Sequence, residues 1–297
     1  MKTVRADWKT KSTQDETLRL PAVAGSFYEG SRKVLSAQVQ DFIDSATLKS
    51  TEGELIGLIS PHAGYMYSGH VAGHAYKQLE GKSFDTVILI GLSHRYPVHG
   101  AAIYTHGAFR TPLGDIEIDE ELAAKIISLN SKVIDLPAAH ATEHSLEVQL
   151  PFLQISLSHF RIVPILLQDD APDNVKPLGH AIAQAVGSRS VLLIGSTDLC
   201  HYPAYEEALK SDRVVIEAIT HFDSDDLRHQ MEEYMHTHPT RELHCMMCST
   251  GAVYATMEAA KQLRGNRIEV LSSANSGDVP IGRRDGVVGY MAAAIYR

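Results

Sequence analysis

Residues 86–96, TVILIGLSHRY, contain a β-branched apolar run that ends at a glycine and is followed by a histidine. A short apolar run bounded by small residues is typical of a strand buried on both faces, as in the parallel sheets of α/β proteins. The same pattern occurs in LIGLISPHAGY at 55–65 and in SVLLIGSTDLCHY at 190–202. The sequence therefore predicts three buried strands, each followed closely by a histidine. These histidines are His94, His62 and His201.

Amphipathic stretches separate the apolar runs. Residues 68–79, 118–130 and 173–187 carry apolar residues at helical spacing, and residues 249–265 form a fourth such stretch that is expected to end at Gly265 as its C-cap. Strands that alternate with helices predict a three-layer α/β/α sandwich with a mixed, largely parallel sheet.

The domain organisation is predicted to be simple. No internal repeat, low-complexity linker or abrupt change of composition divides the chain, so we expect a single α/β domain over residues 19–297. Residues 1–18 are mostly polar and are expected to form an N-terminal arm. They contain no apolar segment of the kind found in secretory signals.

Composition excludes several classes of function. The net charge of −9 disfavours a general nucleic-acid-binding protein, which needs a basic face. No apolar run is long enough to span a membrane, so we expect no membrane association. The three cysteines are too few for a disulfide framework and fit a reducing compartment, which predicts a cytoplasmic protein.

The three histidines that follow the strands are candidate metal ligands. In open α/β sheets, ligands bind beyond the carboxyl ends of the strands. If the three strands are parallel, His62, His94 and His201 converge at that edge. Two imidazoles with one anionic donor suit a transition metal and leave positions open for substrate or O₂. The alternative is that each histidine only forms hydrogen bonds within its own loop.

His201 has a carboxylate nearby, because Asp198 precedes it by three residues. A carboxylate near a histidine fixes its tautomer and raises its basicity, which suits a general acid or base. The alternative role for Asp198 is to cap a turn.

Two other motifs allow competing interpretations. His140 and His144 match the H-x-x-E-H pattern of inverzincin peptidases, which requires both histidines on one helix face. Pro137 disfavours a regular helix there, and His144 is kept as a pocket residue. Cys245 and Cys248 form a C-x-x-C, for which a redox dithiol, a structural zinc site and a single thiolate ligand are the alternatives. The single ligand is preferred.

Several segments resemble the Memo family, in order and over residues 20–297. They are PAVAGSFYEG at 21–30, SPHAGYMYSGHVAGHAY at 60–76, EHSLEVQLPFLQ at 143–154 and IGSTDLCHY at 194–202. The resemblance implies a fold similar to class III extradiol dioxygenases, which use non-haem Fe(II) to open aromatic diol rings.

The resemblance also implies roles for individual residues. His62 and His94 match the two imidazole ligands of the dioxygenases, and a cysteine takes the place of their glutamate. His201, beside Asp198, matches their acid/base histidine. His144 is expected to line the pocket.

The identity of the sulfur ligand depends on register. The family pattern C-G-x-x-P-I-A/G, aligned on Gly251, selects Cys245. The glycine and proline of that pattern are absent here, so Cys248 stays open as the alternative.

The expected activity is that of an Fe(II)-dependent oxidoreductase acting on a small aromatic substrate, with Cu or Zn as alternative metals. The rival function is a metal- or peptide-binding protein without turnover. A homo-oligomer is compatible with either.

Overall fold

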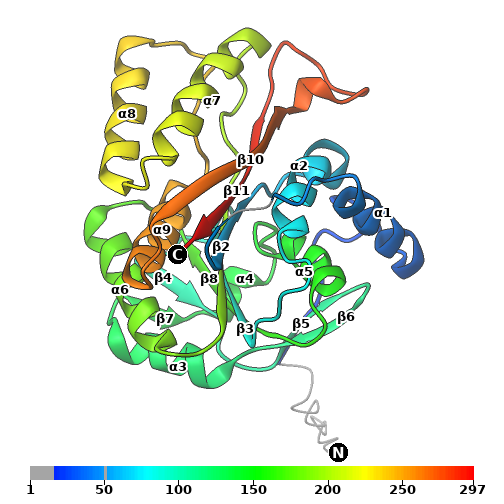
Figure 1. Ribbon diagram of the computed structural model, residues 1–297, viewed down its shortest axis with the longest axis vertical. Helices are drawn as coiled ribbons and strands as arrows, with labels where there is room; N and C mark the ends of the chain where they lie inside the picture. The colour runs from blue at the N-terminus through cyan, green and yellow to red at the C-terminus, as the bar shows by residue number, and fades with distance from the viewer. Residues whose placement is uncertain (1–16, 50–51) are drawn as a thin grey trace, which may run out of the picture.

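The structure is a computed structural model that describes residues 17–49 and 52–297. Within these residues the main sheet has the strand order β10-β11-β2-β9-β3-β8-β4-β7 (Figure 1). These strands are β10 (Arg267–Asn275), β11 (Gly289–Tyr296), β2 (Leu55–Ser60), β9 (Val191–Ser196), β3 (Thr86–Leu92), β8 (Arg161–Leu167), β4 (Ala101–Ile103) and β7 (Val133–Asp135).

The centre of this sheet is parallel. Strands β2, β9, β3 and β8 are successive parallel neighbours, whereas β11 is antiparallel to β2 and β4 is antiparallel to β8. The prediction of a mixed α/β sandwich is confirmed. Because β2, β9 and β3 are adjacent and parallel, their carboxyl ends meet at one edge of the sheet.

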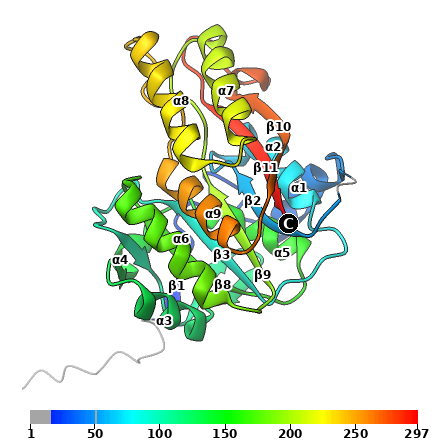
Figure 2. The same cartoon turned by 60° about the vertical axis from the view of Figure 1, so that its left-hand side comes forward.

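Each central strand contributes to two hydrophobic cores. In β3, Ile88 and Ile90 face one core, and Val87 and Leu89 face the other. Helices cover both faces (Figures 1 and 2). The first core is covered by α3 (Glu120–Leu129), α6 (Pro172–Val186), α7 (Tyr205–Ile219), α8 (Ser224–Thr237) and α9 (Thr250–Gln262). The second core is covered by α1 (Arg32–Asp44), α2 (Tyr65–Lys77) and α5 (Leu150–Ser156).

A small second sheet holds the start of the described chain. Its order is β1 (Leu18–Arg19), β5 (Ala108–Thr111) and β6 (Gly114–Glu117). The buried carboxylate of Glu147 pairs with Arg19 of β1 and accepts hydrogen bonds from the amide of Val23 and the hydroxyl of Tyr28, which follow β1. These bonds attach the N-terminal segment to the segment that also carries His144.

The structure differs from the sequence-based expectations in detail. Strands β4 to β7 are not predicted, because three or four residues are too few to show a strand pattern. Helix α9 ends at Gln262, and Arg264, not Gly265, takes the left-handed conformation with φ of 68°. Gly265 instead donates its amide hydrogen to the carbonyl of Ala260 at 2.7 Å.

The predicted arm falls largely outside the described residues, since residues 1–16 are not among them; Leu18 already belongs to β1. Among the described residues, every helix is too short or too polar to cross a bilayer.

Candidate metal centre

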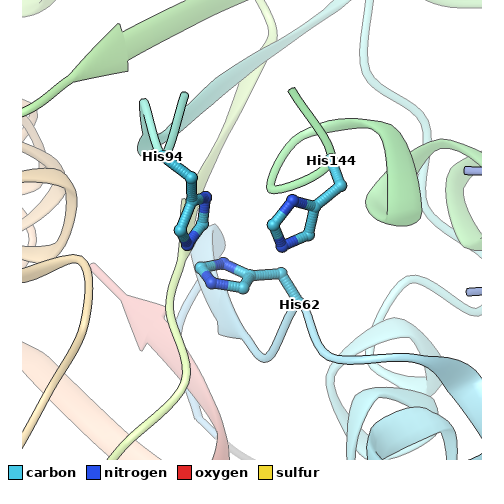
Figure 3. Close-up of side chains that lie close together, drawn as sticks. All are labelled: His62, His94 and His144. Atoms are coloured by element: carbon cyan, nitrogen blue, oxygen red, sulfur yellow. The ribbon is translucent and has the colours of Figure 1, made fainter. Parts of the chain in front are cut away.

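Three histidines meet at the carboxyl edge of the parallel strands. His62 follows β2, His94 follows β3, and His144 lies in the turn between α4 (Pro137–His140) and η1 (Glu147–Gln149). One ring nitrogen from each histidine can be chosen so that all three lie within 4.8 Å of one another, and the three rings point toward one another (Figure 3). The His94 and His144 rings are stacked at 4.4 Å, and His62 presents its ring at 86° to that of His94. Three imidazoles in this arrangement can hold a metal ion.

The carboxylate of Glu143 orients two of these histidines. It accepts the amide hydrogen of His94 at 2.6 Å, the amide hydrogen of His144 at 2.8 Å, and makes a 2.9 Å contact with His94 Nδ1. Burial alone would raise the pKa of Glu143, but the hydrogen bonds and charge of His94 outweigh burial and lower it to about 2. An ionised acceptor at Nδ1 leaves Nε2 of His94 available as a ligand.

His144 is suited to metal binding because its imidazole is neutral. Burial, followed by the proximity of His62, lowers the pKa of His144 to about 3. Its Nδ1 lies 3.3 Å from a carboxylate oxygen of Glu143, and its ring packs 4.8 Å from that of Phe27. Sequence reasoning placed His144 in the pocket; its proximity to both other imidazoles comes from the fold. The role of Glu143 was missed, although it lies next to His144 in the same motif.

The two cysteines of the C-x-x-C occupy different positions. Cys245 forms an isolated antiparallel bridge with His201, and the amide of Cys248 donates a hydrogen bond to the carbonyl of Asp198 at 3.2 Å. Cys248 Sγ lies 3.2 Å from His62 Nε2 and accepts the amide hydrogen of Asp198 at 3.2 Å. Burial, with a smaller effect of Cys248, raises the pKa of Cys245 to about 12. The structure therefore brings the sulfur of Cys248 to the histidines, whereas Cys245 lies three residues earlier in the chain, opposite His201.

Asp198 and His201 line the same pocket as the three histidines. Asp198 Oδ1 accepts the amide hydrogens of His62 at 2.7 Å and Ala63 at 3.2 Å, which holds the turn after β2. His201 Nε2 is buried and has no hydrogen-bond partner among the described residues. An unpaired buried nitrogen beside a pocket is available to a ligand.

The pocket itself has a volume of about 490 Å³. Aromatic and aliphatic side chains form much of its wall: Phe27, Tyr67, Tyr202, Ile281 and Tyr290. A cavity of this size with apolar walls and a few polar groups is typical of a small-molecule site.

The peptidase interpretation is wrong. Helix α4 ends at His140, and His144 lies beyond it, so the two histidines do not share a helix face. His140 is buried, with Nε2 3.3 Å from the carbonyl oxygen of Ala102.

Comparison with known proteins identifies relatives over nearly the whole chain. Residues 19–294 match a family described as Memo-like protein. A MEMO1 family protein of Methanothermobacter thermautotrophicus is 38% identical over 283 residues, which cover 92% of this chain and 98% of the relative. A MEMO1 family protein of Methanopyrus kandleri is 38% identical over 290 residues, which cover 94% and 99%.

A solved structure of an uncharacterized protein from Escherichia coli K12 is more distantly similar. It aligns with 80% of this chain and 99% of its own, at 12% sequence identity and a TM-score of 0.49.

Proposed function

The chain belongs to the Memo-like family, and on that premise we propose that it is an Fe(II)-dependent oxidoreductase that acts with O₂ on a small aromatic substrate. The observation that carries the proposal is the approach of three imidazoles, within 4.8 Å, beside a pocket with aromatic walls. Bound Fe(II) would supply open coordination positions and redox chemistry toward O₂. A dioxygenase reaction adds both oxygen atoms to the substrate and requires no separate reductant.

The donor set supports a transition metal over Mg²⁺ or Ca²⁺. Imidazole nitrogens suit Fe, Cu and Zn, and a thiolate favours the same group. His62 and His94 are the proposed nitrogen ligands, with His144 close enough to be a third. The 3.2 Å distance between Cys248 Sγ and His62 Nε2 supports Cys248, rather than the predicted Cys245, as the sulfur donor.

His201 is the proposed proton carrier. Its Nε2 has no hydrogen-bond partner among the described residues and lies beside the pocket, so it is available to accept a proton from a substrate hydroxyl group. Asp198 acts through the backbone turn that carries His62, which makes it a positioning residue in this proposal.

Oxygen uptake by the protein loaded anaerobically with Fe(II) tests the proposal. With a panel of 3,4-dihydroxyphenyl compounds, we expect uptake that is lost by ~10²-fold or more in His201→Ala while the Fe(II) content stays at the wild-type value. His229→Ala is the matched control, because that side chain is exposed and outside the pocket. Undiminished uptake in His201→Ala would overturn the proton-transfer role, and absence of Fe(II) binding would overturn the proposed function.

A second candidate function is metal-dependent binding without turnover. Tyr202 and Ile281 are 53% and 55% exposed at the pocket wall, which favours contact with a larger ligand such as a peptide. Stoichiometric metal binding without oxygen uptake across the panel would favour this candidate.

A further inference from the structure

The imidazole of His62 is buried and has a polar neighbour at each ring nitrogen. Nδ1 lies 3.1 Å from Ser196 Oγ, and Nε2 lies 3.2 Å from Cys248 Sγ. Asp198 Oδ2, at 4.0 Å from Nε2, is beyond hydrogen-bond distance. A neutral imidazole binds a metal through the nitrogen that carries no hydrogen, so the tautomer decides whether Nε2 can serve as a ligand.

Ser196 has one hydroxyl hydrogen, and the structure shows where it goes. Ser196 Oγ donates it to the carbonyl oxygen of Ser145 at 2.6 Å, because a carbonyl can only accept. The same oxygen accepts a hydrogen bond from Gln149 Nε2 at 2.9 Å. Its remaining lone pair can therefore only accept, so the hydrogen between Ser196 and His62 belongs to His62 Nδ1.

The amide of Gln149 is held in one orientation. Nε2 also donates to the carbonyl oxygen of Pro61 at 2.9 Å, and Oε1 accepts the hydroxyl hydrogen of Tyr76 at 2.6 Å. A flipped amide would place Oε1 against the Pro61 oxygen and lose two hydrogen bonds. Gln149, Tyr76 and Ser196 are all buried, so bulk water does not replace these bonds.

We propose that Tyr76, Gln149 and Ser196 are positioning residues that hold His62 as the Nδ1–H tautomer and so direct the lone pair of Nε2 toward a bound metal ion. This inference rests on the proposed metal-binding function and adds the residues that prepare its most buried ligand. Outer groups of this kind fix ring orientation and raise ligand basicity.

The tautomer is measurable without any metal. Long-range ¹H–¹⁵N NMR of the metal-free wild-type protein, with His62→Gln used to assign the signals, is expected to show Nδ1 of His62 protonated and Nε2 unprotonated. The opposite tautomer in this protein would overturn the inference.

A Co(II) titration of metal-free protein measures the consequence for binding. Ser196→Ala removes the acceptor at Nδ1, and we expect Co(II) to bind about 10- to 100-fold more weakly, with a mixture of His62 tautomers by NMR. Gln149→Met, a second variant, is also expected to bind Co(II) more weakly and to show a mixture of His62 tautomers. Ser211→Ala is the matched control, since that buried hydroxyl donates to a carbonyl within α7, and it should change neither.

The outcomes separate the two proposals. If folded Ser196→Ala binds Co(II) with wild-type affinity and keeps the wild-type His62 tautomer, the proposed positioning role is overturned and the proposed function still stands. Absence of Co(II) binding by the wild-type protein would overturn the proposed function, while the metal-free NMR measurement still supports or overturns the tautomer.

Discussion

At the scale of single residues, two cysteines three positions apart have different environments. Cys248 faces His62 and receives an amide hydrogen bond, whereas the backbone carbonyl of Cys245 accepts the amide hydrogen of His201 at 3.1 Å. The sulfur of Cys248 is therefore the one that the structure brings against a histidine nitrogen.

This difference predicts unequal effects of removing each thiol. Cys248→Ala is expected to weaken Co(II) binding by more than ~10-fold and to abolish the thiolate-to-Co(II) charge-transfer absorption, because the sulfur donor is lost. Cys245→Ala, the matched variant, should keep that absorption. Loss of the band in Cys245→Ala and its retention in Cys248→Ala would reinstate Cys245 as the ligand.

At the scale of elements, the packing of α1 against α2 depends on two glycines. A Cβ at Gly69 would lie 2.4 Å from the ring of Phe42, and a Cβ at Gly73 would lie 2.4 Å from the Phe42 carbonyl oxygen. The Phe42 ring is only half-buried and packs 6.2 Å from the rings of Tyr65 and Phe152. A shift of this side chain costs less than a shift of its backbone, which is fixed within α1. The carboxyl-terminal turn of α1 therefore sets the closest approach of these helices.

Alanine substitution at the two glycines should have unequal costs. Both changes favour the helix by ~1 kcal/mol. Gly73→Ala also forces α1 away and is expected to lower the free energy of unfolding by about 1–3 kcal/mol net. Gly69→Ala should lie near the wild-type value, because the ring can rotate. Urea unfolding measures both, and equal effects would contradict the distinction between backbone and side-chain contact.

At the scale of the whole molecule, buried titratable groups make stability depend on pH. Asp212 of α7 is 7% exposed and accepts the amide hydrogen of Cys200 at 3.1 Å. Burial raises the pKa of Asp212 to about 7, with the Cys200 hydrogen bonds acting in the opposite direction. The raised pKa means that the folded state holds the proton more tightly. The resulting contribution of Asp212 to the free energy of unfolding is complete below the unfolded pKa of ~3.9 and is lost as pH rises through 7.

Asp212→Asn is expected to gain stability relative to wild type as pH rises from about 4 to 7, by a few kcal/mol in total. The comparison is made as a difference because His140, whose pKa burial lowers to about 3, contributes the opposite slope in both proteins. Asp115→Asn is the control. Arg110 lowers the pKa of Asp115, so the effect of this carboxylate on the pH dependence of stability falls below about pH 4. A constant difference between Asp212→Asn and wild type in urea unfolding would refute the assignment.

Much of this protein can be predicted from local patterns. The run from Thr86 to Ile90 specifies a buried strand, because burial on both faces requires continuous apolar residues. The positions of His62 and His94 just after such strands predict their meeting, since parallel strands have their carboxyl ends at one edge. The pairing of the strands as parallel neighbours bears this out.

Other features depend on contacts between distant segments. His62 and Cys248 are separated by 186 positions, and the hydrogen bonds between Cys248 and Asp198 hold the cysteine beside His62. The contacts of Glu143 with His94 and of Gln149 with Ser196 likewise join different elements. Local sequence determined the central strands β2, β3 and β9 and the chemical groups that follow them. Tertiary structure decided which sulfur and which hydrogen-bond acceptors reach the histidines, because a register shift of a few residues changes those distances without changing any local pattern.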